Sequence, residues 1–108
     1  MTQAPKPPKT YQDFVERYPK LEQAWELISE AGKEGNFDDK TIRLIKLGIA
    51  MGAMKQGSVN AGVRKALAMG ITREEIEQII ALTCGTLGMS STVAVFSWVQ
   101  AVFEQEND

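Results

Sequence analysis

The polar residues best suited to chemistry in this sequence lie in a short break between two apolar stretches. Lys55, Ser58 and Asn60 fall within the segment Lys-Gln-Gly-Ser-Val-Asn that follows Met54. An ammonium group, a hydroxyl, an amide and the backbone N–H groups of a helix start can together hold a carboxylate. Arg43 belongs to the apolar stretch that this break follows, and its guanidinium would add a second positive charge. The segment favours an anion-binding site, with an ordinary loop and helix cap as the open alternative.

Two features of the composition narrow the chemistry further. The chain contains no histidine and a single cysteine, Cys84. Without histidine there is no imidazole base near neutral pH, so Ser-His-Asp catalysis, Cys-His catalysis and a His-ligated zinc site are excluded. One cysteine excludes an intrachain disulfide and a two-thiol redox cycle. Neither a metal nor a cofactor is predicted.

Cys84 itself lies in an apolar stretch beside Leu82, Thr83 and Leu87. Free cysteines are among the most buried residue types, and this pattern favours a small buried hydrophobe. The alternative is a one-cysteine redox centre. That role would need exposed, electropositive surroundings, which the sequence does not indicate.

Size and charge set the class of protein. The chain has 108 residues, enough for one domain with a modest core, and a net charge of −2. No broad basic face is available to attract nucleic acid. No apolar segment that resembles a signal peptide follows Met1, so a cytoplasmic location is expected.

The elements that must position these residues are predicted to be helices, in an all-α domain. A proline-rich arm over residues 1–9 is predicted to be disordered, and residues 10–108 are predicted to form a single domain. The predicted helix starts are Thr10, Pro19, Asp38 or Asp39, Ser58 or Asn60, Arg73, and Ser90 or Ser91. In the helix from Pro19, a stripe of Leu21, Trp25 and Ile28 should pack on the rest.

Local signals fix several helix ends. Gly57 breaks the helix that starts near Asp38, and Gly70 is predicted to end the following helix in a left-handed conformation. Thr72 and Glu75 match a capping box, in which each side chain bonds the other residue's backbone N–H. Arg64 and Lys65 are predicted to lie on a solvated face.

Two helices carry more apolar residues than one packing face requires. The helix from Asp38 has two apolar stripes, which predicts contacts on two sides; the stripes are Ile42, Ile45 and Ile49, and Leu44, Leu47 and Met51. The last helix is apolar nearly all round but is too short for a membrane span of about 20 residues. A helix apolar on every side must be covered on every side, so a homo-oligomer is expected.

With these elements in place, the sequence resembles the carboxymuconolactone decarboxylases and the alkylhydroperoxidase-like (AhpD-like) proteins. The similar segments are Asp-Asp-Lys-Thr-Ile-Arg-Leu-Ile from Asp38, Gly-Val-Arg-Lys-Ala-Leu from Gly62, Gly-Ile-Thr-Arg-Glu-Glu-Ile from Gly70, and the apolar helix pair that follows. The resemblance runs from about Phe37 to Phe103. It implies an all-α fold of five to six helices that assembles through apolar helices, with a trimer or hexamer favoured.

The resemblance also shows where this sequence departs from peroxidase members. Those members carry a Cys-x-x-Cys pair. A histidine follows the second cysteine by four residues, and a glutamate precedes the first cysteine by twelve residues. The matching positions here hold Lys55 and Ser58, Gly62, and Arg43. Some relatives without the cysteines have histidines at the positions that match Asn60 and Gly62, and these are also missing here. Thiol peroxidase chemistry is therefore not expected.

The function predicted from these residues is the binding of a small anionic organic molecule. The pocket would contain Arg43, Lys55, Ser58, Asn60 and Gly62, where an arginine and a lysine replace an acid and a thiol of the relatives. One alternative is a cysteine-independent decarboxylase of a carboxylated lactone, with Arg43 and Lys55 stabilising the enolate. Another is a non-catalytic oligomeric scaffold.

Overall fold

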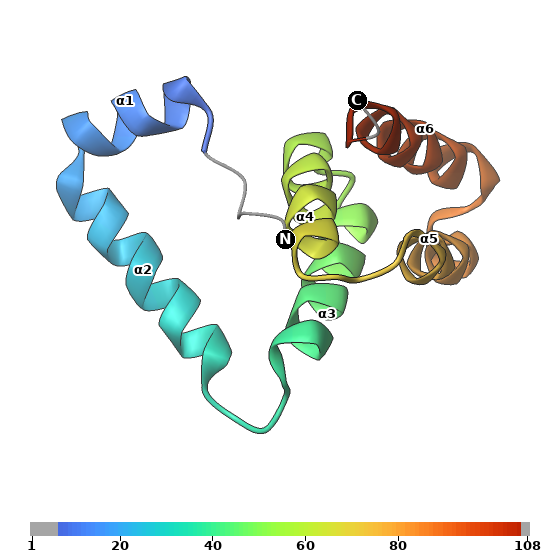
Figure 1. Ribbon diagram of the computed structural model, residues 1–108, viewed down its shortest axis with the longest axis horizontal. Helices are drawn as coiled ribbons and strands as arrows, with labels where there is room; N and C mark the ends of the chain where they lie inside the picture. The colour runs from blue at the N-terminus through green and yellow to red at the C-terminus, as the bar shows by residue number, and fades with distance from the viewer. Residues whose placement is uncertain (1–6, 107–108) are drawn as a thin grey trace. The chain divides into compact units, whose positions relative to one another are not determined.

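The computed structural model describes residues 7–106, and this part of the chain is all-α, as predicted (Figure 1). Its helices are α1 (Lys9–Arg17), α2 (Pro19–Lys33), α3 (Asp39–Gly52), α4 (Gln56–Ala68), α5 (Arg73–Leu87) and α6 (Met89–Glu106). Residues 1–6 of the arm predicted to be disordered lie outside the described residues. No helix in the described part is long and apolar enough to cross a membrane.

The chain separates into two compact units, one with α1 and α2 and the other with α3 to α6. The prediction of a single domain over residues 10–108 stays a prediction. In the larger unit, α3 packs against α4 and α5, and α6 packs against α4 and α5. This arrangement encloses one apolar core; its members are Leu47, Met51, Val59, Val63, Ala66, Ile71, Ile76, Ile80, Val95, Val99, Val102 and Phe103.

The helix ends of this unit follow their local signals. The Asp38 carboxylate caps α3 by accepting a hydrogen bond from the Thr41 N–H at 2.8 Å. Both bonds of the Thr72–Glu75 capping box are present at the start of α5. Gly70, with a φ of +88°, and Gly88, with a φ of +83°, occupy left-handed conformations that glycine adopts without strain. The predictions made for Asp38, Gly70 and the Thr72–Glu75 capping box are confirmed.

The starts of α1, α4 and α6 differ from the sequence prediction; α6 begins at Met89, before Ser90 and Ser91. Helix α1 begins at Lys9, so Thr10 is not its cap. Helix α4 begins at Gln56, and Gly57, Ser58 and Asn60 all lie inside it. Gly57 occupies the second helical position, where the backbone N–H has no intrahelical partner to lose. A glycine there interrupts the apolar pattern without ending the helix.

The α1–α2 unit has no core of its own. None of the residues of α1 or α2 is buried. Phe14 and Tyr18 stack with their ring centroids 5.2 Å apart, and Lys9 pairs with Asp13. The α2 stripe remains exposed, with exposed fractions of 50% for Leu21, 56% for Trp25 and 61% for Ile28. The prediction that this stripe packs on the rest of the chain stays a prediction.

Of the two apolar stripes of α3, the one that contains Ile45 and Ile49 is also exposed. Leu47 and Met51 are buried between α3 and its neighbours, whereas Ile45 is 43% exposed and Ile49 is 65% exposed. On α6, Val95 and Val99 face the core, but Val93 and Phe96 are exposed. The larger unit therefore has one satisfied core and additional apolar surface around it.

Replacing Thr72 with alanine should destabilise the larger unit through loss of the α5 cap. N-cap substitutions of this kind cost about 1 kcal/mol. The free energy of unfolding, measured by urea denaturation, should fall by about that amount. Thr86→Ala is the matched control, because it makes the same change at an exposed position of the same helix. An equal loss in both variants would contradict a specific capping role for Thr72.

Candidate functional site

Arg43 is the central residue of the predicted site, and the structure places it on α3, half-buried. Its Nε atom is inaccessible to solvent and has no hydrogen-bond partner among the described residues. Burial lowers the pKa of the Arg43 guanidinium, because the charged form loses contact with water. A buried donor without a partner is costly, and a change of the Arg43 side chain that exposed this nitrogen would let it bind a ligand oxygen.

Lys65, on α4, is the charged neighbour of Arg43. Partial burial lowers the pKa of the Lys65 ammonium, and the positive charge of Arg43 lowers it further. The Lys65 side chain nonetheless remains exposed at the surface. No carboxylate among residues 7–106 forms an ion pair with either residue. Two cations with no acid between them make this surface strongly attractive to an anion.

Close packing between α3 and α4 brings these two residues together. Gly62 of α4 lies against the Leu47 side chain, and a Cβ added at Gly62 would be 3.0 Å from the Leu47 Cδ2 atom. Arg43 lies one turn before Leu47, and Lys65 lies almost one turn after Gly62. Helices α3 and α4 are joined by a short connection and run antiparallel. Arg43, before Leu47 on α3, and Lys65, after Gly62 on α4, therefore lie toward the same end of the helix pair.

Helix geometry also shows which predicted residues share the flank of Lys65. Ser58, Gly62 and Lys65 have the spacing i, i+4, i+7, which places them on one side of α4. Ser58 lies roughly 10 Å from Lys65 along the helix axis, at about 1.5 Å per residue. We call the surface formed by Arg43, Ser58, Gly62 and Lys65 the α3–α4 flank.

Asn60 does not belong to the α3–α4 flank. It lies two residues after Ser58 within α4, so its side chain leaves the helix about 160° away. Asn60 and Arg64 are four residues apart and share that other side, where Asn60 Oδ1 and Arg64 Nη1 are buried without a partner among the described residues. The side chains of Ser58 and Asn60 could face one ligand only if these residues formed a loop. Because α4 already begins at Gln56, both residues are helical and their side chains point to different sides.

Lys55 is the N-cap residue of α4 and is exposed. From Arg43 to the end of α3 at Gly52 the helix rises by roughly 13 Å. Arg43 and Lys55 therefore lie at opposite ends of the α3–α4 pair, and the structure gives them no common pocket.

Lys65 is not among the pocket residues predicted from the sequence; Arg64 and Lys65 were predicted to lie on a solvated face, with a subunit boundary as the alternative for the arginine. The available signal was the spacing of Lys65 from Gly62 and Ser58, which places it on their side of the helix. That signal becomes usable only when α4 is known to start before Ser58.

Cys84 is half-buried near the end of α5. Its Sγ atom lies 3.5 Å from the Met89 Sδ atom. Within the described residues, no group of three or more cysteine and acidic side chains is arranged to hold a metal ion.

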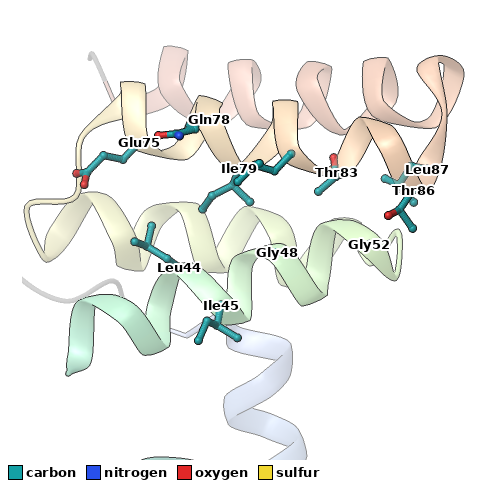
Figure 2. Close-up of a pocket in the computed structure, with 11 residues that line it drawn as sticks. Leu44, Ile45, Gly48, Gly52, Glu75, Gln78, Ile79, Thr83, Thr86 and Leu87 are labelled. Carbon is teal, nitrogen blue, oxygen red and sulfur yellow. The ribbon is translucent and has the colours of Figure 1, made fainter. Parts of the chain in front are cut away.

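A separate groove runs between α3 and α5, with a volume of about 580 Å³ (Figure 2). Most of its lining surface is apolar; the residues are Leu44, Ile45, Gly48, Gly52, Glu75, Gln78, Ile79, Leu82, Thr83, Thr86 and Leu87. Gly48 and Gly52 contribute backbone in place of side chains on the α3 side. None of the predicted pocket residues lines this groove. Arg43 and Ile45 are two residues apart on α3 and leave it on opposite sides, so the groove and the α3–α4 flank are distinct surfaces.

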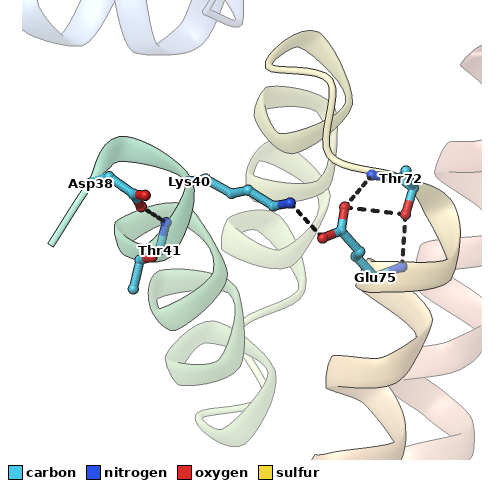
Figure 3. Close-up of polar contacts among 5 residues, drawn as sticks. All are labelled: Asp38, Lys40, Thr41, Thr72 and Glu75. Atoms are coloured by element: carbon cyan, nitrogen blue, oxygen red, sulfur yellow. Dashed lines mark hydrogen bonds and ion pairs between the residues drawn. The ribbon is translucent and has the colours of Figure 1, made fainter.

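A polar cluster lies at the Glu75 end of the groove (Figure 3). Glu75 pairs with Lys40 of α3 at 2.6 Å and accepts a hydrogen bond from the Thr72 N–H at 3.0 Å. The Lys40 contact and then the Thr72 N–H lower the pKa of the Glu75 carboxyl. This carboxylate already has its partners, so it stabilises the helix start and links α3 to α5.

Most of the chain matches a known protein family. A sequence profile of the carboxymuconolactone decarboxylase family matches residues 19–101. Searches of curated proteins and of solved structures found no match.

Substituting Arg43 with glutamine should raise the pKa of Lys65, because one of the two causes that lower it is the Arg43 charge. The reactivity of Lys65 toward acetic anhydride, followed by mass spectrometry as a function of pH, measures this pKa. Arg17→Gln is a control that removes an exposed charge elsewhere. An unchanged Lys65 profile in Arg43→Gln would contradict the electrostatic contact.

The Glu75 cluster predicts loss of stability in acid. A carboxyl with a lowered pKa in the folded state contributes stability above its ordinary pKa, and this contribution is lost as the pH falls through the folded pKa. The free energy of unfolding should therefore decrease between about pH 6 and about pH 3. The decrease should be smaller in Glu75→Gln, which keeps an acceptor for Thr72. Glu74→Gln, at an exposed position of the same turn, should behave like the parent.

Proposed function

The chain belongs to the carboxymuconolactone decarboxylase family, and within that family we propose that it binds a small organic carboxylate on the α3–α4 flank. The observation that supports this function is the pair of cations, Arg43 and Lys65, which have no carboxylate partner among the described residues. A bound anion would be stabilised here, because its negative charge would offset the repulsion between the two cations and the cost of their partial burial.

The two cations suit different parts of the interaction. A guanidinium is planar and can bind a carboxylate through two parallel hydrogen bonds, whereas an ammonium acts as a compact point charge. Arg43 Nε is the donor without a partner, and Lys65 is accessible from solvent. A carboxylate that bridges these groups would satisfy both.

The rest of the flank favours a ligand with a second polar group. Ser58 lies on the same side of α4 as Lys65, and Lys55 lies beyond it at the N-terminus of the helix. The Ser58 hydroxyl would add a donor for a second polar group of the ligand. Asn60 is not part of this proposed site.

A cysteine-independent decarboxylase is the second candidate, and the lowered pKa of Lys65 favours it. Loss of CO2 breaks the bond between the carboxylate carbon and its neighbour and leaves the electron pair on that neighbour as an enolate. Arg43 would bind the departing carboxylate and stabilise the enolate charge. A lysine ammonium with a lowered pKa is a better acid, so Lys65 would transfer its proton to the enolate carbon and regain one from water.

We also propose that the chain forms a homo-oligomer, whether or not it has an enzymatic activity. Apolar side chains that remain exposed on α3 and α6 support this proposal; they include Ile49, Val93 and Phe96. A non-catalytic scaffold would also form an oligomer, but it would not bind the small carboxylates tested below. Native mass spectrometry gives the subunit number.

A thermal-shift screen of small mono- and dicarboxylates tests the binding function. At least one carboxylate should raise the melting temperature of the parent, and its affinity should fall about 10- to 100-fold in Arg43→Ala and Lys65→Ala, because each loses an interaction with a charged group. Lys20→Ala removes an exposed lysine from α2 and should have no effect. Equal binding by the parent and the Arg43 and Lys65 variants would contradict the site.

CO2 release from the carboxylates that bind separates the decarboxylase from a simple binder. Peroxide turnover with a thiol donor should be absent in the parent and in Cys84→Ser alike.

A further inference from the structure

Two cations of the larger unit, Arg43 of α3 and Lys65 of α4, repel each other, and the fold keeps them together. The contact between Leu47 and Gly62 sets the register of α3 on α4 and holds both cations toward the same end of the helix pair. Among the described residues of α3 to α6, no carboxylate forms an ion pair with either cation. A reaction that replaced one of these positive charges with a negative charge would turn the repulsion into an ion pair.

Lys65 is the member of the pair that can undergo such a reaction. A lysine amine is a nucleophile once it has lost its ammonium proton, whereas a guanidinium keeps its charge in proteins. Partial burial, and then the positive charge of Arg43, lower the pKa of the Lys65 ammonium, which increases the fraction present as free amine. Lys65 therefore combines a reactive nitrogen with a neighbouring cation that would stabilise an anionic product.

CO2 is a reactant of the required kind. The lone pair of Lys65 Nζ attacks the carbon of CO2, a nitrogen–carbon bond forms, and one carbon–oxygen electron pair moves onto oxygen. Nζ then releases a proton to water, so the product is a carbamate with one negative charge. A carbamate has the two-oxygen geometry of a carboxylate, which a guanidinium binds through two hydrogen bonds. The terminal nitrogens of Arg43, unlike Nε, are not among the buried polar atoms that lack a partner.

We propose that Lys65 is a carbamylation site, at which CO2 forms a carbamate that pairs with Arg43. The site shares its residues with the proposed carboxylate site, but it does not require that any carboxylate binds there. A carbamate on Lys65 and a free carboxylate would compete for Arg43, so CO2 would weaken the binding of a carboxylate ligand.

Trapping of the carbamate tests the site. The full chain is equilibrated with isotopically labelled bicarbonate and CO2, treated with triethyloxonium tetrafluoroborate, and digested for mass spectrometry. This reagent converts a carbamate into a stable ethyl ester, so the labelled lysine is identified by its mass. The label should be about 10-fold higher at Lys65 than at Lys20, an exposed lysine of α2, because a hydrogen-bonded charge pair has about this effect on an equilibrium.

Substitutions at position 43 test the role of the positive charge. Arg43→Gln removes the cation, and the label at Lys65 should fall to the level at Lys20. Arg43→Lys keeps a positive charge and should retain most of the label at Lys65. The comparison of Lys65 with Lys20 within the parent needs no substitution, so it holds even if a variant does not fold.

Equal labelling of Lys65 and Lys20 in the parent, or no label at Lys65, would overturn the carbamylation site. Undiminished labelling in folded Arg43→Gln would also overturn it. The thermal-shift screen, carried out in CO2-free buffer, decides carboxylate binding separately. A chain that is labelled at Lys65 but binds no carboxylate retains this site and rejects the proposed function, and a chain that binds a carboxylate without labelling rejects this site alone.

Discussion

The close packing of α3 on α4 is the contact on which the rest of the larger unit depends. Gly62 allows the Leu47 side chain to lie directly against the α4 backbone, and both residues are part of the buried interior. This contact fixes the register of the antiparallel pair. It therefore decides which residues of α3 face which residues of α4, and it places Arg43 beside Lys65. A larger residue at position 62 would force Leu47 to move and would shift that register.

The α3–α4 flank has the opposite electrostatic character to a thiol peroxidase site. Such a site needs a thiolate and a proton relay, and the matching positions here hold Lys55, Ser58, Gly62 and Arg43. The fold is retained while the groups that would activate a thiol are absent. Positive charge in a partly desolvated position is suited to holding a carboxylate, because the field of a charge is stronger where water is excluded. Family membership and the chemistry of the site must therefore be argued separately.

The apolar surface of the chain is divided unequally between its two units. The larger unit encloses a core made by α3 to α6, yet leaves apolar residues exposed along α3, α5 and α6. The α1–α2 unit buries nothing. Exposed apolar area of this extent is unfavourable in water, and covering it is the main source of free energy for association. The two distinct surfaces of α3, one charged and one apolar, lie on different sides of the same helix.

The sequence alone determined the helices of the larger unit and most of their ends, because these depend on local signals. Apolar periodicity, the Asp38 cap, the Thr72–Glu75 capping box and the glycines at 70 and 88 act within a few residues of each other. Family resemblance was equally accessible, since it rests on the order of such segments. The sequence also identified Arg43 as a residue of interest.

Only the tertiary structure decided which charges meet. Lys65 became the partner of Arg43 because the Leu47–Gly62 contact sets the register between two helices, and no local signal encodes that register. Asn60 and Lys55 lie apart from this pair for a similar reason: one is on the other side of α4, and the other is at the far end of the helix pair. The groove between α3 and α5 likewise exists only once the two helices are packed, since its walls come from segments about thirty residues apart.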